Sequence, residues 1–327
     1  MKKIAVIGAG LSGLSVASLL KNRAEVVVFE KARGVSGRMS TRYAGPYCFD
    51  HGAQYFTVRT EAFKTFIQPL INNGIIGRWN ANYVKFDGQR ITERKNWLND
   101  EPRYVGIPGM NSIAKHLSED LNIHINTRIT SLKQANSWQL IDEEDKVYDG
   151  FDWVIFTVPA PQTLALIPET FQYYTDISAV KMRACFALML GFANPLTFKF
   201  EAAHISNADL SWLAVNSHKP GRANQFTLVV HSSEDYAETH FDDDREIMIK
   251  HLCAQTSDIS GYDVSRADYK TIHRWRYANN AVRKNHPVLI DQNLNLAVCG
   301  DWCLGGRIEN AFTSAYNLTN VMKESLL

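Results

Sequence analysis

Cysteine is scarce in this sequence, and its arrangement argues against a disulfide framework. Five cysteines are spread over 327 residues, at positions 48, 185, 253, 299 and 303. An odd, scattered set without a Cys-x-x-Cys pair favours free thiols over disulfides or a thiolate zinc site. We therefore expect a protein of the reducing cytoplasm.

Long apolar runs and an excess of one charge are also missing. No uninterrupted apolar stretch approaches the ~20 residues that a membrane-spanning helix needs, so we expect no membrane partner. Lys and Arg number 35 against 34 Asp and Glu, without a basic run, which disfavours nucleic acid as a partner. Lys2-Lys3 and the apolar residues after it resemble a secretory signal. Glycines interrupt that stretch, so we expect it to stay in the mature protein.

Several short motifs of other enzyme classes are absent. The ten histidines contain no His-Glu-x-x-His or other close pair, so we expect no metal site. No Gly-x-Ser-x-Gly motif of a hydrolase nucleophile is present. A single Gly-x-Gly-x-x-Gly motif occurs, whereas a dedicated second dinucleotide domain would need another.

The chain is organised around the loop from Gly8 to Gly13. Short apolar runs at 4–7 and 26–29 flank it, apolar residues at helical spacing lie between them, and Glu30 follows. This order of strand, glycine turn, helix, strand and acidic residue predicts a dinucleotide-binding unit. Gly10 lets a pyrophosphate approach the backbone, and Glu30 is placed to accept hydrogen bonds from a ribose.

Two further segments extend this pattern and carry a family resemblance. Ser36-Gly37-Arg38 follows Glu30-Lys31, and His51-Gly52-Ala53-Gln54-Tyr55 comes next. With the glycine loop, these segments resemble the flavin amine oxidase superfamily, and within it the renalase-like FAD oxidoreductases of bacterial type. Many members have two glycines before the arginine, whereas this chain has Ser36-Gly37 and keeps Arg38. The resemblance implies an FAD-dependent oxidoreductase.

A second glycine turn lies near the end of the chain. An apolar run at 296–299 leads into Gly300-Asp301, and a helical pattern begins at about Arg307 after two glycines. This arrangement again predicts a binding site at the carboxyl end of a strand. The resemblance implies that Asp301 binds the ribityl chain and that the helix N-terminus faces the flavin ring. Two glycine turns far apart in the sequence would then hold opposite ends of one FAD.

Pattern and resemblance together imply a set of ligand-binding residues for a non-covalent FAD. The cofactor-binding residues are expected to be Gly8, Gly10, Leu11, Ser12, Glu30, Lys31, Arg38, Met39, Ala53, Gln54, Ile129, Asp301 and Ile308. Substrate contacts are expected at Tyr55, His231, Arg276 and Trp302. Among the cofactor residues, Gly8, Gly10 and Ser12 should meet the pyrophosphate, Arg38 the phosphates or ribose, and Gln54 the flavin edge. No catalytic residue beyond the flavin is assigned.

The predicted fold is α/β. A Rossmann-like FAD-binding domain would comprise 1–58, 104–160 and 286–327. A substrate domain of mixed β-sheet and helices would be inserted as 59–103 and 161–285, in a topology like that of amine oxidases and p-hydroxybenzoate hydroxylase.

Local periodicity predicts further elements outside the nucleotide unit. Apolar spacing predicts a helix near 63–71, and alternation predicts strands at 123–129, 185–192 and 225–231.

The resemblance also implies a reaction: hydride transfer to flavin, followed by reoxidation with O2. Renalase-like enzymes oxidise 2- or 6-dihydro isomers of NAD(P)H to NAD(P)+ and form hydrogen peroxide. Such a hydride loss yields an aromatic cation and needs no general base, and the sequence shows no obvious base motif. Two alternatives remain open. One is an amine oxidase for primary amines or polyamines with an aromatic cage of Tyr55, Trp275, Tyr277 and Trp302; the other is a flavin-containing binding or redox-sensing module without turnover.

Overall fold

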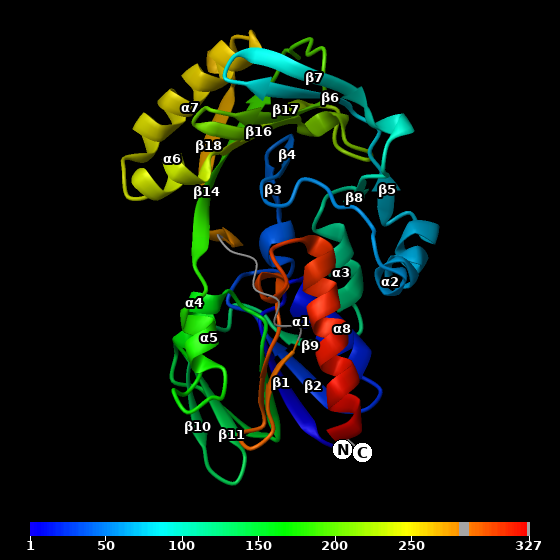
Figure 1. The fold of residues 1–327 in the computed structure, drawn as a ribbon, viewed down its shortest axis with the longest axis vertical. Helices are drawn as coiled ribbons and strands as arrows, with labels where there is room; N and C mark the ends of the chain where they lie inside the picture. The colour runs from blue at the N-terminus through cyan, green and yellow to red at the C-terminus, as the bar shows by residue number, and fades with distance from the viewer. Residues whose placement is uncertain (281–287, 326–327) are drawn as a thin grey trace.

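The computed structural model describes residues 1–280 and 288–325. Figure 1 shows an elongated molecule in two tiers, with a six-stranded sheet in the lower tier and a seven-stranded sheet in the upper. We call the junction between the tiers the waist. The predicted domain boundary between 285 and 286 lies outside the described residues, and the division into two domains stays a prediction.

The lower sheet has the strand order β19-β20-β13-β1-β2-β9 and is parallel except where β19 pairs with β20. Its strands are β1 (Lys3–Ile7), β2 (Glu25–Phe29), β9 (Asn122–His124), β13 (Trp153–Phe156), β19 (Leu289–Asp291) and β20 (Leu296–Val298). After Lys3 and Glu25 at the starts of β1 and β2, the central strands are apolar because both faces of the sheet are covered. This arrangement confirms the predicted α/β class.

Helices cover one face of the lower sheet, and a small sheet with two short helices covers the other. The first layer contains α1 (Leu11–Leu20), α3 (Ser112–Ser118) and α8 (Ile308–Ser325). The second contains β10 (Ile129–Gln134), β11 (Trp138–Asp142), β12 (Val147–Phe151), α4 (Ala160–Leu164) and α5 (Tyr174–Ser178). Alternate residues of β1 serve the two layers: Val6 packs toward α1 and α8, whereas Ala5 packs toward the small sheet.

The upper sheet has the order β18-β14-β17-β16-β15-β6-β7, antiparallel except between β15 and β6. Its strands are β6 (Asn82–Asp87), β7 (Arg90–Asn96), β14 (Met182–Phe192), β15 (Ala202–Ser206), β16 (Leu210–Val215), β17 (Phe226–Ser232) and β18 (Tyr269–Asn280). Strands from both predicted insertions therefore share one sheet. The helix α2 (Glu61–Asn72) and the pair β5 (Ile76–Arg78) and β8 (Tyr104–Gly106) lie beside the waist (Figure 1).

The two faces of the upper sheet meet different parts of the chain. α6 (Glu234–Thr239) and α7 (Arg245–Ser260) pack on the face that carries Phe186 and Leu188 of β14. The hairpin of β3 (Thr41–Ala44) and β4 (Tyr47–Asp50) packs on the opposite face, where Phe49 contacts Met189. The hairpin thus reaches from the lower tier to the underside of the upper sheet (Figure 1).

One predicted strand is wrong. The residues 123–129 form the end of β9 and the start of β10, which belong to different sheets. Asn126 has φ 52°, a left-handed conformation that ends the extended run and redirects the chain. The helix predicted near 63–71 and the strands predicted at 185–192 and 225–231 are confirmed as α2, β14 and β17. Within the described ranges, no helix is both long and apolar enough to cross a membrane.

Candidate functional site

Two helix N-termini meet at one edge of the lower sheet. β1 and β20 both run parallel to β13, so α1 and α8, which follow them, begin at the same edge. The helices lie side by side in Figure 1, and the Ser12 hydroxyl donates to the carbonyl of Ala311 at 3.0 Å. The positive ends of two helix dipoles therefore point to one place, which favours a negatively charged ligand.

The glycine loop combines a tight turn with open space. Gly8 has φ 109°, and its N–H donates to the Phe29 carbonyl at 2.8 Å. A Cβ added to Gly13 would lie 1.9 Å from the Gly8 oxygen, so α1 packs directly on the turn. A Cβ added to Gly10 would meet nothing within 4 Å. The loop therefore offers bare backbone N–H groups to a ligand, which fits a pyrophosphate.

Glu30 is buried beneath this loop and fixed by two backbone donors. Its Oε2 accepts from the N–H of Ala9 at 2.8 Å, and its Oε1 accepts from the N–H of Ala32 at 2.8 Å. Each carboxylate oxygen can accept a further hydrogen bond. This geometry fits a ribose diol, while Lys31 beside it is exposed.

Arg38 and Asp301 join two distant parts of the chain at the same edge. Arg38 lies in a short 3₁₀ turn, and its guanidinium binds the Asp301 carboxylate through Nη1–Oδ2 at 3.0 Å and Nη2–Oδ1 at 2.5 Å. Nη1 also donates to the Ala278 carbonyl at 3.1 Å. The bidentate pairing is a strong, oriented contact. The sequence predicted roles for both residues at the cofactor but not that they pair.

The segment Gly52 to Gln54 packs tightly against Arg38. The N–H of Ala53 donates to the Arg38 carbonyl at 2.8 Å, and a Cβ at Gly52 would lie 1.9 Å from that oxygen. The Gln54 amide nitrogen donates to the carbonyls of Asp50 at 2.6 Å and Gly52 at 3.0 Å. Both amide hydrogens of Gln54 are therefore bonded within the protein. A flavin ring beside Gln54 would meet the backbone of the segment from Gly52 to Gln54 rather than the amide hydrogens of Gln54.

A buried ionic cluster lies under this segment, and the sequence analysis missed it. The Asp50 carboxylate contacts Lys219 at 3.3 Å and Arg222 at 2.5 Å, and all three side chains are at most 1% exposed. Burial acts to raise the pKa of Asp50, but Lys219 and Arg222 outweigh it and the pKa is lowered. Lys219-Pro220-Gly221-Arg222 has the composition of a solvent-exposed turn. No signal in the sequence marked it as buried.

Three histidines and an indole line the underside of the upper sheet near Gln54. His51 stacks on Trp275 at 5.3 Å between ring centroids and meets His273 edge to face at 4.9 Å. His231 Nε2 lies 3.4 Å from the Gln54 amide nitrogen. Burial lowers the pKa of His51 to about 3 and those of His231 and His273 to about 4, so the three rings are neutral at pH 7. We call these four residues the ring wall.

The structure does not bring the four predicted substrate residues together. His231 belongs to the ring wall. Tyr55 packs with Trp79, Trp97 and Trp212, and Trp212 lies opposite His231 on the neighbouring strand β16. The indole N–H of Trp302 is buried and donates to the Val158 carbonyl at 3.0 Å.

Arg276 lies on the other face of the upper sheet. It follows Trp275 along β18, so its side chain points to the opposite side, where its guanidinium lies 3.8 Å from the Phe241 ring centroid. The remaining predicted cofactor residues border the sheet edge or its flanking layers, and their roles stay predictions: Leu11, Met39, Ile129 and Ile308.

Two models of known protein families match this chain, and they identify the family to which it belongs. Residues 6–70 match an NAD(P)-binding Rossmann-like domain, and residues 81–320 match the flavin containing amine oxidoreductases. The chain belongs to the flavin containing amine oxidoreductase family. The predicted superfamily and the prediction of a flavin-dependent oxidoreductase are thereby confirmed.

Known proteins resemble the chain in sequence or in fold to different extents. Mouse (Mus musculus) renalase is 26% identical over 179 residues, which cover 51% of this chain and 49% of renalase. The match thus spans about half of that relative's length. In fold, a protein of Exiguobacterium sp. 255-15 provisionally assigned as a protoporphyrinogen oxidase superposes with TM-score 0.79 at 10% identity, over 99% of this chain and 98% of that one. A putrescine oxidase variant gives TM-score 0.73 at 11% identity, over 98% and 99%.

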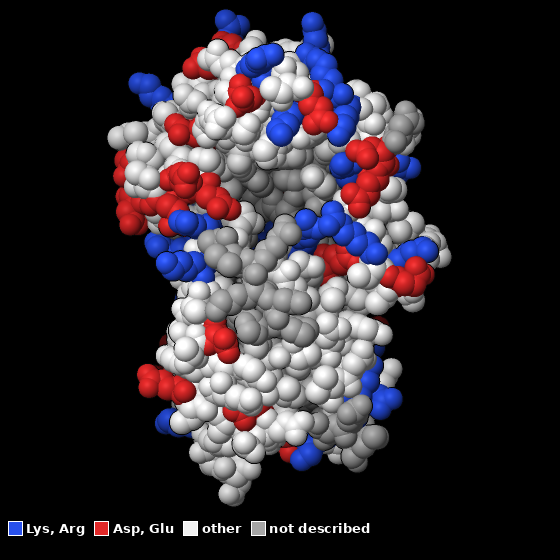
Figure 2. Space-filling model, in the orientation of Figure 1, with Lys and Arg blue, Asp and Glu red and all other residues white. Residues whose placement is uncertain are grey.

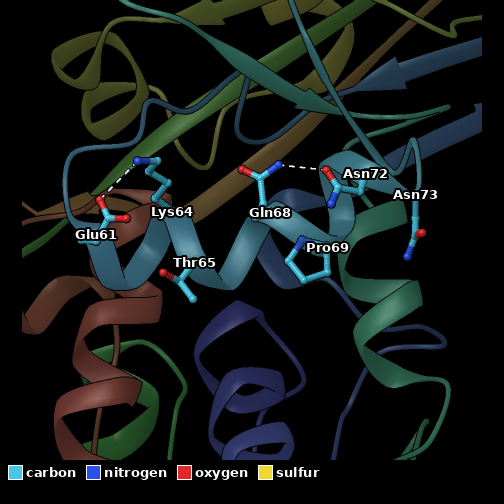
Figure 3. Close-up of a pocket in the computed structure, with 7 residues that line it drawn as sticks. All are labelled: Glu61, Lys64, Thr65, Gln68, Pro69, Asn72 and Asn73. Atoms are coloured by element: carbon cyan, nitrogen blue, oxygen red, sulfur yellow. Dashed lines mark hydrogen bonds and ion pairs between the residues drawn. The ribbon is translucent and has the colours of Figure 1, made fainter.

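One surface depression lies outside this edge and does not contribute to it. This depression, shown in Figure 3, lies along α2 and is lined by Glu61, Lys64, Thr65, Gln68, Pro69, Asn72 and Asn73. Its polar side chains bond one another, Lys64 to Glu61 at 3.3 Å and Gln68 to Asn72 at 2.9 Å. None of the predicted site residues lines it. Among the described residues, no group of three His, Cys, Asp or Glu side chains is arranged to hold a metal ion.

Proposed function

We propose that this flavin oxidoreductase is an FAD-dependent oxidase that takes a hydride from isomeric 2- or 6-dihydro-NAD(P). NAD(P)+ would be released, and O2 would be reduced to H2O2. The ring wall is the observation that carries the proposal. Its histidines have pKa values of about 3 to 4, far below the value that suits a general base at neutral pH. A dihydropyridine that loses a hydride becomes an aromatic cation and gives up no proton, so it needs no such base.

The lower sheet edge would hold the FAD. The backbone at Gly10 would bind the pyrophosphate, and Glu30 would bind the adenosine ribose. The ion pair of Arg38 and Asp301 would contact the region between the phosphates and the ribityl chain. The bound flavin would supply the hydride-accepting chemistry, and the protein would supply position and charge. On both sides of the waist in Figure 2, Lys and Arg side chains lie beside Asp and Glu side chains, so this face carries charges of both signs.

We propose non-covalent attachment of the flavin. Cys299 and Cys303 are the cysteines next to the second glycine turn, and both are buried. Burial raises the pKa of Cys303 to about 12 and that of Cys299 well above its usual value. Both thiols therefore stay protonated and are poor nucleophiles. Together with three further buried free cysteines, they also support the cytoplasm as the compartment.

An amine oxidase is less well supported. The aromatic cage proposed from the sequence needs Tyr55, Trp275, Tyr277 and Trp302 around one substrate. Tyr55 packs with Trp79 and Trp97, Trp275 stacks on His51, and Trp302 is hydrogen-bonded to Val158. These contacts give three of the four side chains partners other than one another.

Rapid mixing tests the proposal. The purified yellow protein is mixed anaerobically with 2- or 6-dihydro-NAD(P), with the ordinary 4-dihydro isomer as the control. We expect the flavin absorbance to bleach within seconds with the isomers and far more slowly with the control. Bleaching by primary amines or polyamines instead would show an amine oxidase. No bleaching with any of them would favour a binding or redox-sensing module.

A further inference from the structure

The buried cluster of Asp50, Lys219 and Arg222 carries more positive than negative charge. Two cations contact one carboxylate, so 2 − 1 leaves one positive charge in excess. Within the described part of the chain, neither cation contacts a second carboxylate. Arg222 donates instead to the carbonyls of Gly106 and Pro220, and Lys219 lies 5.3 Å from the Trp79 ring centroid.

An excess charge in the interior is costly unless a counter-charge lies nearby. Burial lowers the pKa of Lys219 to about 8, but that value still leaves the ammonium group mostly protonated at pH 7. The excess charge therefore persists under neutral conditions. It favours an anion in the adjoining site, because attraction between charges is stronger in a buried region than in water.

Lys219 is also a structural link across the waist. It follows β16 and a 3₁₀ turn at Asn216–His218 of the upper tier, whereas Gln54 belongs to the segment packed on Arg38. The Lys219 ammonium donates to the Gln54 amide oxygen at 3.0 Å. This bond fixes the amide so that its nitrogen donates to the carbonyls of Asp50 and Gly52.

We propose that Lys219 is a positioning residue for the flavin ring, and that its charge favours the anionic reduced flavin over the oxidised form. Through Gln54 it holds the segment from Gly52 to Gln54 in the conformation that receives the ring. The helix N-terminus of α8 favours the same reduced state, so the two effects add. The proposal rests on the FAD chemistry proposed above.

Two substitutions separate the charge from the hydrogen bond. Lys219→Gln keeps an N–H donor near Gln54 but removes the charge, whereas Lys219→Met removes both. In each variant Asp50 stays paired with Arg222, so the cluster becomes neutral. Lys64→Met is the matched control, because Lys64 is exposed on α2 and pairs with the exposed Glu61.

The measurements are the midpoint potential of the bound FAD and the affinity of the flavin for sulfite. We expect both Lys219 variants to stabilise the reduced flavin about tenfold less than the wild type, a shift of about 30 mV for a two-electron couple. Sulfite affinity should fall in parallel. Lys219→Met should in addition release FAD faster than Lys219→Gln does, and Lys64→Met should match the wild type throughout.

Two outcomes would overturn a proposal, and a third would leave one variant to decide. Potentials and sulfite affinities equal to the wild type in flavin-loaded Lys219→Gln would overturn the inference and leave the proposed function standing. If Lys219→Met fails to fold, as judged by thermal unfolding, Lys219→Gln alone decides the charge effect. A wild-type protein that binds no flavin would overturn the proposed function, and the inference with it.

Discussion

Glu30 shows at the scale of a single residue how the fold prepares for a ligand. Its two carboxylate oxygens accept from the N–H groups of Ala9 and Ala32, and its side chain is buried. Glu30→Ala removes the predicted ribose ligand and leaves the buried N–H of Ala9 unpaired, at about 1–3 kcal/mol, while the N–H of the exposed Ala32 can bond water. We expect FAD affinity to fall at least about tenfold, as measured by flavin retained after dialysis.

The control for this change is Glu25→Ala. Glu25 is the exposed first residue of the same strand, β2, so its loss should leave FAD occupancy at the wild-type level. Equal retention of FAD by Glu30→Ala and Glu25→Ala would contradict the role given to Glu30.

The Arg38–Asp301 pair makes a second prediction at this scale. Both side chains are partly exposed, so we discount the bidentate contact for solvent screening to about 1–2 kcal/mol. Arg38→Met and Asp301→Asn should each destabilise the apoprotein, and the double variant should lose less than the sum of the two. Urea unfolding of the four proteins measures this coupling. Strict additivity would show that the contact does not hold the two ends of the chain together.

At the scale of an element, two glycines at the start of helix α1 allow the effects of ligand binding and of packing to be measured separately. A Cβ at Gly13 would meet the Gly8 backbone oxygen at 1.9 Å, whereas a Cβ at Gly10 would point into open space. Gly13→Ala should therefore destabilise the apoprotein by about 2 kcal/mol or more, because helix and turn must move apart. Gly10→Ala should leave the apoprotein as stable as the wild type and still weaken FAD binding.

Thermal unfolding of both apoproteins, with FAD titration of each, tests this pair. The two variants are controls for one another, since each adds one methyl group, at Gly10 just before α1 or at Gly13 within it. A Gly10→Ala protein that binds FAD normally would show that the pyrophosphate does not lie on this loop.

The low pKa values of the three histidines in the ring wall predict how the stability of the protein depends on pH. The folded pKa values of His51, His231 and His273, about 3, 4 and 4, lie below the value of about 6.5 for an unfolded histidine. Between those values the unfolded chain binds more protons than the folded one. The contribution of the three neutral histidines to the free energy of unfolding is therefore complete above about pH 6.5. It is lost as the pH drops toward 4.

Urea midpoints measured from pH 7.5 down to about 4 follow this loss, and His231→Gln should reduce its steepness because one titrating ring is gone. Glutamine keeps a polar side chain beside Gln54, which makes it a closer match than alanine. An unchanged slope in His231→Gln would mean that this ring does not contribute to the acid sensitivity.

For the whole molecule, the two glycine turns and the strands before them could be predicted because their signals are local. Gly10, Glu30 and Asp301 lie at turns that only a few neighbouring residues define. The α/β class followed from the order of strand, glycine turn, helix and strand together with the family resemblance, whereas α2, β14 and β17 followed from periodicity.

The ionic cluster could not be predicted, because its burial depends on tertiary packing. Lys219 and Arg222 are buried only because the β3–β4 hairpin lies beneath the upper sheet and brings Asp50 to them. The orientation of Arg276 escaped for a related reason, since the register of β18 decides which face it occupies. At 123–129 the alternating pattern was real, but the left-handed Asn126 ended the strand.

The molecule as a whole is proposed to hold one FAD between its two glycine turns and to reduce it with an isomeric dihydronicotinamide. The most direct measurement is an anaerobic titration of the purified protein with 2- or 6-dihydro-NAD(P), followed by readmission of O2. The account predicts that one equivalent bleaches one bound flavin, and that O2 restores the yellow colour while one equivalent of H2O2 forms. A protein that carries no flavin, or one whose flavin stays oxidised in excess dihydronicotinamide, would contradict it.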